Sequence, residues 1–126
     1  MLLVLDTNVL VSGLLNPIGA PGRIVDLILA GHLRLAYDDR ILAEYRAVLL
    51  RSRFGFPPQA VEHLLGYITH TGEAIIAPPL TVEAPDPTDL PFAEVALAAS
   101  ACCLVTGNAP HFAFLQTPSC FHLPNS

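Results

Sequence analysis

The chain has 126 residues and a formal net charge of −5, with 52% hydrophobic and 13% charged residues. This composition excludes an intrinsically disordered chain and also a generic polyanion binder that relies on bulk attraction. The length suits one domain with one core over residues 1–126.

The three cysteines form neither a disulfide framework nor a zinc-binding spacing. No apolar stretch reaches the roughly 20 residues that cross a membrane. The first 15 residues lack the basic start of a signal peptide, and Asp6 interrupts their apolar run. We therefore expect a cytoplasmic protein with no membrane segment.

All six basic residues are arginines, and the sequence concentrates five of them within 20 positions, at Arg34, Arg40, Arg46, Arg51 and Arg53. Arginine suits bidentate contacts to phosphate, so a local basic strip on an acidic protein is one interpretation. A compositional bias against lysine explains the same pattern equally well.

Short apolar runs predict strands, in chain order, at residues 2–5, 33–37, 73–77 and 102–105, with an edge strand near 120–123. Helical periodicity and capping residues predict helices at 23–30, from 38 or 39 to about 53, at 59–69 and at 90–101. The segments 16–22 and 78–91 are rich in Pro and Gly or in Pro and acids, which indicates loops. This alternation predicts an α/β fold, with a central, mostly parallel sheet of 4–5 short strands flanked by helices.

Polar residues end two of the predicted strands. Asp6 follows the apolar run of residues 2–5, and Thr106-Gly107-Asn108 follows the run of residues 102–105. Open α/β sheets bind ligands beyond the carboxyl ends of their strands, so these two clusters predict one site.

Two further carboxylates fall on predicted helices. Glu44 lies at the border of the apolar face of the helix that begins near residue 39. Glu94 lies on a helix that is apolar nearly all round, so it must be paired, protonated or bound to a metal. That helix leads into the strand before Thr106, so we expect Glu94 to point towards the same rim as Asp6. Asp86 and Asp89 precede the helix, and capping is the simplest role for either, Asp86 above all.

Gathered carboxylates repel one another unless a cation separates them. Mg²⁺ or Mn²⁺ does this with one or two carboxylates and with substrate phosphates. Such a metal can activate a water for attack on phosphorus. The sequence therefore favours phosphodiester chemistry.

These motifs resemble the PIN-domain nucleases, and most closely the VapC-type toxins of toxin–antitoxin pairs. The resemblance runs in order through Leu5-Asp6-Thr7-Asn8, Glu44, Asp86-Pro87-Thr88-Asp89, Phe92-Ala93-Glu94 and Leu104-Val105-Thr106-Gly107-Asn108. It implies a PIN-like domain whose catalytic acids are Asp6, Glu44, Asp89 and Glu94.

The resemblance also implies metal ligands and supporting residues. Asp6 would hold the metal, together with Asp89 or Glu94, between which the sequence leaves the choice open. Thr7, Asn8 and Thr106 would orient ligands or a water. Asn108 departs from the family, where many relatives have an acid, and an amide contributes no charge to a second metal site.

The resulting hypothesis is an Mg²⁺- or Mn²⁺-dependent endoribonuclease, the toxin of a pair with a separate antitoxin, which cleaves RNA. The apolar composition favours a C₂ homodimer, an antitoxin interface, or both. The alternative is a catalytically degenerate domain that keeps the fold as a binding module. A phosphohydrolase with a nucleophilic Asp6 is disfavoured, because position 8 is Asn where such enzymes usually have a second Asp.

Overall fold

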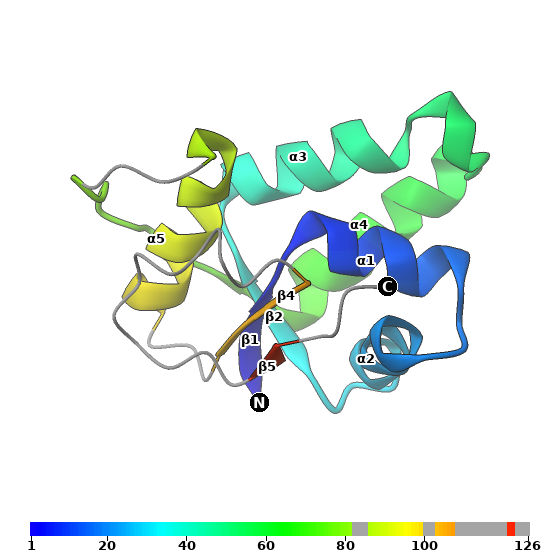
Figure 1. Cartoon of the computed structure of the whole chain (residues 1–126), viewed down its shortest axis with the longest axis horizontal. Helices are drawn as coiled ribbons and strands as arrows, with labels where there is room; N and C mark the ends of the chain where they lie inside the picture. Colours follow the sequence, from blue (N-terminus) through cyan, green and yellow to red (C-terminus); the bar gives the residue numbers. More distant parts are fainter. Residues whose placement is uncertain (82–85, 100–102, 108–120, 123–126) are drawn as a thin grey trace.

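The computed structural model describes residues 1–81, 86–99 and 103–107, and the backbone of 121–122. Within these residues, no helix combines the length and the apolar character that crossing a membrane requires. Strands and helices alternate along the chain (Figure 1). The predicted α/β class is confirmed.

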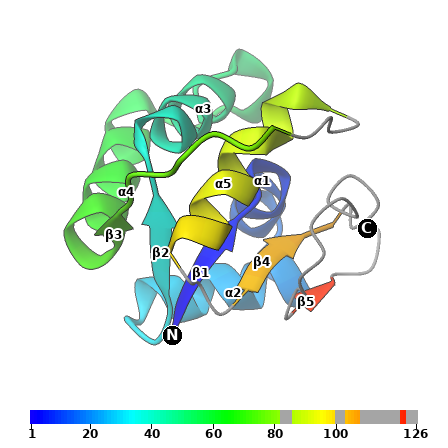
Figure 2. The same ribbon diagram turned by 90° about the vertical axis from the view of Figure 1, so that its left-hand side faces the viewer.

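The sheet contains five described strands in the order β3-β2-β1-β4-β5, and all the pairs are parallel (Figure 2). The strands are β1 (Leu2–Leu5), β2 (Arg34–Tyr37), β3 (Glu73–Ala74), β4 (Cys103–Thr106) and β5 (Phe121–His122). The central strand β1 pairs with β2 on one side and with β4 on the other, where Leu5 lies opposite Val105. Its residues Leu3 to Leu5 are fully buried, as expected for a central strand of a parallel sheet.

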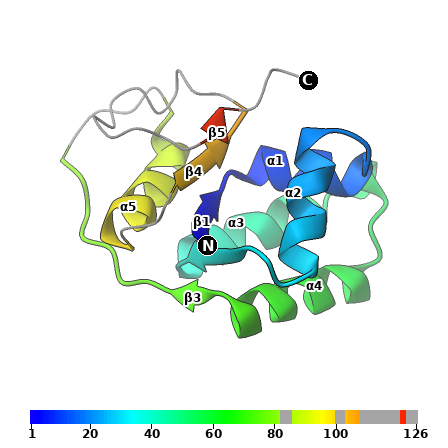
Figure 3. The same cartoon turned by 90° about the horizontal axis from the view of Figure 1, so that it is seen from below.

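Helices cover both faces of the sheet. They are α1 (Thr7–Leu15), α2 (Ala20–Leu29), α3 (Asp39–Leu49), α4 (Pro58–Thr71) and α5 (Leu90–Ala98), with short 3₁₀ helices η1 (Ser52–Phe54) and η2 (Pro87–Asp89). Figures 1 and 3 show α5 on one side of the sheet and α1, α2 and α4 on the other. Helix α3 runs across the end of the sheet at which β2 finishes.

Several boundaries differ from those predicted. Residues 7–15, for which no helix was predicted, form α1, and α2 begins at Ala20 inside the predicted loop. Helix α1 packs closely on α2 at Gly13, where a Cβ would lie 2.5 Å from the Pro21 carbonyl oxygen. Helix α3 ends at Leu49, because the chain tightens into η1 and then turns at Gly55, whose φ is +69°. Strand β3 is only two residues long.

Tyr45 connects α3 to the central strand β1 through a buried hydrogen bond. Its side chain is completely buried, its hydroxyl donates a 2.6 Å hydrogen bond to the Leu5 carbonyl oxygen, and its ring contacts Phe92 of α5. Burial raises the pKa of Tyr45, and the carboxylates of Asp6 and Glu44 raise it further. The neutral phenol therefore holds the helix that carries Glu44 beside the end of β1.

Replacement of this tyrosine tests the connection. Tyr45→Phe should lower the free energy of unfolding by about 1–2 kcal/mol, because the Leu5 carbonyl loses its donor inside the core. Urea denaturation measures this loss. The matched control is Tyr67→Phe, whose hydroxyl bonds the Ile28 and Leu29 carbonyls in a less buried position, and it should lose less.

The pH dependence should also differ between the wild type and Tyr45→Phe. The folded protein keeps the Tyr45 proton above the usual tyrosine pKa near 10, where the unfolded chain releases it. Tyr45 therefore makes its full contribution to the free energy of unfolding below about pH 10. Above that pH the contribution falls by about 1.4 kcal/mol per pH unit. Equal slopes for the two proteins above pH 10 would contradict this role.

Candidate active site

The strand order reverses at β1, because β2 and β3 follow on one side of it and β4 on the other. Ligands of open α/β sheets bind beyond the carboxyl ends of the strands at such a point. Asp6 and Thr106 end the two adjacent strands there. The Asp6 N–H donates to the Val105 carbonyl at 3.0 Å, and the Thr106 hydroxyl donates to Asp6 Oδ2 at 2.8 Å.

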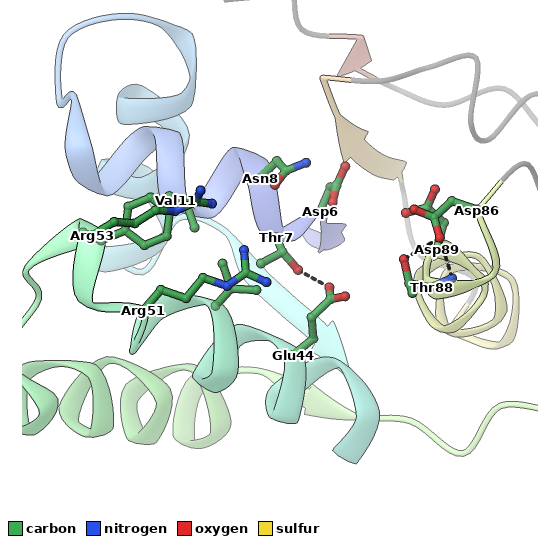
Figure 4. Close-up of a pocket in the computed structure, with 12 residues that line it drawn as sticks. Asp6, Thr7, Asn8, Val11, Glu44, Arg51, Arg53, Asp86, Thr88 and Asp89 are labelled. Carbon is green, nitrogen blue, oxygen red and sulfur yellow. Dashed lines mark hydrogen bonds between the residues drawn. The ribbon is translucent and has the colours of Figure 1, made fainter.

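A pocket of about 220 Å³ opens beside these residues. Four carboxylates line it, from Asp6, Glu44, Asp86 and Asp89. Figure 4 shows Asp6 and Glu44 between the Asp86–Asp89 segment on one side and Arg51 and Arg53 on the other. The remaining lining residues are Thr7, Asn8, Val11, Val48, Phe54 and Thr88. The structure thus brings together three of the four predicted acids.

Glu44 enters the pocket from α3. It is half-buried, as its position at the border of the apolar face predicts, and it accepts a hydrogen bond from the hydroxyl of Thr7. Thr7 is the first residue of α1, directly after Asp6. This contact links the second acid to the segment that carries the first.

Asp86 and Asp89 have different positions around η2. Asp86 is the N-cap of η2, and its Oδ1 accepts from the Thr88 backbone N–H at 3.0 Å and the Thr88 hydroxyl at 2.8 Å. Asp86 therefore has a capping role, but it caps η2 and not α5, the helix for which the cap was predicted. Asp89 occupies the N-cap position of α5, but its side chain makes no capping hydrogen bond. Capping does not explain Asp89.

Threonine hydroxyls orient three of the pocket carboxylates. Thr106 donates to Asp6, Thr7 donates to Glu44, and Thr88 donates to Asp86. A neutral hydroxyl directs a carboxylate oxygen without adding a positive charge next to it. The pocket therefore keeps the hard, anionic oxygen donors that Mg²⁺ and Mn²⁺ prefer.

The comparison with protein families matches residues 2–109 to the PIN domain. The match spans most of the chain. This chain belongs to the PIN domain family. PIN domains are generally nucleases that depend on divalent metals, so nuclease chemistry is the general activity that membership indicates. Neither the comparison with curated proteins nor the comparison with solved structures found a match.

In this PIN domain, Glu94 lies apart from the other predicted acids. It is buried, but it does not line the pocket. Its Oε1 accepts from Arg40 Nη1 at 2.6 Å, and its Oε2 accepts from the Leu80 backbone N–H at 2.6 Å. Five residues along a helix correspond to a rotation of about 140°, so Asp89 and Glu94 cannot both face the same cavity.

Three of the four predicted supporting residues lie near the pocket. Thr7, Asn8 and Thr106 lie at the pocket or at the adjacent strand end, whereas Asn108 lies outside the described residues. Arg51 and Arg53 were not predicted as site residues. Two signals in the sequence point to them. Both belong to the cluster of five arginines between residues 34 and 53, and Arg51 follows Glu44 by about two helical turns.

The carboxylates that line the pocket suit a divalent cation that keeps part of its water shell. Within the described part of the chain, no group of three or more His, Cys, Asp or Glu side chains is arranged so that it could hold a metal ion by itself. Mg²⁺ does not need such a group, because it retains several waters and binds through one or two carboxylates and substrate phosphates. One or two of the pocket carboxylates could supply the protein's share of such a set.

The contacts of Glu94 and Asp89 predict losses of stability of different size when each is replaced by its amide. Glu94→Gln should lower the free energy of unfolding by about 1–3 kcal/mol, because Arg40 loses a charged partner in the interior, although Arg40 itself is half-exposed. Asp89→Asn should lower it by less, since Asp89 is less buried than Glu94 and the change breaks no capping hydrogen bond. Urea denaturation of both variants compares them. A greater loss for Asp89→Asn would make Asp89 the structural carboxylate.

Proposed function

We propose that this PIN domain is an endoribonuclease that hydrolyses RNA phosphodiester bonds with Mg²⁺ or Mn²⁺. The observation that supports it most is the gathering of Asp6, Glu44 and Asp89 around one pocket from three separate segments of the chain. Asp6 directly follows β1, Glu44 lies within α3, and Asp89 directly precedes α5. Carboxylates placed together at a strand-order reversal, in a family of nucleases, favour metal-assisted hydrolysis.

Each acid would have a defined part in this reaction. Asp6 and Asp89 would hold the cation, and Glu44 would orient the attacking water. The chemistry that a bound cation supplies is activation of water and neutralisation of charge on the phosphate oxygens. Thr106 and Thr7 would set the orientation of Asp6 and Glu44 through their hydroxyls.

Glu94 fits a positioning role better than a metal-ligand role. Through Arg40 it joins α5 to the first turn of α3, since Arg40 also bonds Asp38 at 2.7 Å. Asp38 caps α3 by accepting from the Ile41 N–H. This network would keep α5, and so Asp89, in register with the helix that carries Glu44.

We also propose that the protein is the toxin of a toxin–antitoxin pair and acts in the cytoplasm. Its partner would be an antitoxin or a second copy of the chain. Exposed apolar side chains support a partner surface, among them Ile18 at 83%, Leu15 at 51% and Leu29 at 49% exposure. They lie on α1, on α2 and on the segment between these helices. Light scattering at high concentration should give twice the chain mass, and a monomer without a copurifying partner would contradict the proposal.

Removal of one charge tests the metal chemistry. Asp6→Asn should abolish RNA cleavage while stability stays unchanged or rises, because an amide oxygen can still accept from the Thr106 hydroxyl and fewer carboxylates then repel one another. Cleavage of a labelled RNA with Mg²⁺ or Mn²⁺, measured beside urea denaturation, gives both quantities. Loss of folding together with activity would instead make Asp6 a structural residue.

The alternative of a catalytically degenerate binding module rests on Asn108 and is separated by the same assay. A wild-type chain that cleaves RNA with either metal excludes it. If the wild type is inactive and Asn108→Asp creates cleavage, the natural protein is the binding module, because the added acid supplies the missing charge for the metal. Inactivity of both proteins would overturn the nuclease proposal.

A further inference from the structure

The pocket has a second, positively charged side. Arg51 and Arg53 line it opposite Asp86 and Asp89, with Asp6 and Glu44 between the two groups (Figure 4). Arg51 precedes η1 and Arg53 lies within it, directly after the helix that carries Glu44. One side of the pocket is therefore lined by carboxylates and the opposite side by guanidinium groups.

The arginines of the chain differ in their partners. Ion pairs between described residues join Arg40 to Asp38 and Glu94, and Arg46 to Glu62. Arg51 and Arg53 take part in none of these pairs, although both are exposed and line a pocket that also contains four carboxylates. Two guanidinium groups in a cavity, with no ion-pair partner among the described residues, favour an anionic ligand.

Local structure places these two side chains. The Arg51 N–H donates to the Val48 carbonyl and the Phe54 N–H donates to the Arg51 carbonyl, both at 3.1 Å, so η1 continues directly from α3. The Arg53 guanidinium lies 4.8 Å from the centroid of the Phe54 ring, and Phe54 packs against Phe56. A guanidinium on an aromatic ring keeps its N–H groups available at its edge.

We infer that Arg51 and Arg53 form a subsite for a backbone phosphate of single-stranded RNA next to the scissile one. This inference rests on the proposed function, which places the scissile phosphate at Asp6 and Glu44. The carboxylate side would repel a phosphate without its metal, whereas the arginine side attracts one directly. The strand would therefore lie along the pocket from the metal side to the arginine side, and the two arginines would fix its position by bidentate contacts.

The test measures binding separately from cleavage. All variants carry Asp6→Asn, and a fluorescently labelled, mixed-sequence single-stranded RNA is titrated by anisotropy at several salt concentrations. Arg51→Gln and Arg53→Gln should each raise the Kd by roughly 5–10-fold, and each should reduce the salt slope by about 0.7. Arg51→Lys should keep the salt slope but bind more weakly than arginine, because it loses the bidentate fork.

The matched control is Arg34→Gln. Arg34 is exposed, has no ion pair among the described residues and begins β2, at the opposite end of that strand from α3. The substitution Arg34→Gln removes the same charge from the whole protein as Arg51→Gln does. If the subsite is local, its Kd and salt slope should equal those of the Asp6→Asn parent. Thermal unfolding of each variant checks that the exposed substitutions leave the fold intact.

The outcomes separate this inference from the proposed function. Equal losses for Arg34→Gln and Arg51→Gln would mean that only net charge matters, and would overturn the subsite. Unchanged RNA affinity in Arg51→Gln and Arg53→Gln would also overturn it, even if the wild type cleaves RNA. A wild type that cleaves no RNA while the two arginine variants selectively lose RNA binding would leave the subsite standing and overturn the nuclease.

Discussion

The carboxyl end of β1 constrains the rest of the structure, because the sheet, the helix α3 and the pocket meet there. Tyr45 donates to the Leu5 carbonyl from α3, and Asp6 follows directly, bonded through its backbone to β4. The same strand end therefore anchors a helix and presents a carboxylate. Any shift of α3 along β1 would move Glu44 relative to Asp6, so packing in the core determines the geometry of the candidate site.

The chain treats its carboxylates in two ways. Glu94, buried between α5 and the start of α3, receives an arginine and a backbone N–H, which neutralise and satisfy it. The pocket carboxylates Asp6 and Glu44 receive threonine hydroxyls, which only orient them. This difference matches what each place requires. A buried carboxylate is costly without a partner, whereas a pocket that binds a cation, as we propose for this one, needs its carboxylates to stay anionic.

An acidic protein needs local features to approach RNA, since its net charge of −5 repels a polyanion. The pocket offers two such features in our proposal, a cation held by carboxylates and the guanidinium pair of Arg51 and Arg53. Both act over short distances, which salt screens less than the attraction of a broad basic surface. Affinity would then depend on fit within the pocket rather than on bulk attraction.

Much of this architecture follows from the sequence, because periodicity and apolar runs are local properties. They predicted the strand at residues 2–5, a helix start at residue 38 or 39, the border position of Glu44 and the parallel sheet. The end of α3 and the start of α2 could not, because they depend on turns at η1 and on the close contact at Gly13. The separation of Asp89 from Glu94 depends on which side of α5 meets the pocket, a matter of tertiary packing. Likewise, the sequence shows a cluster of arginines, but only the fold decides which of them meet carboxylates. Arg40 pairs with Glu94 and Arg46 with Glu62, which lie 54 and 16 residues away along the chain, whereas Arg51 and Arg53 line the pocket.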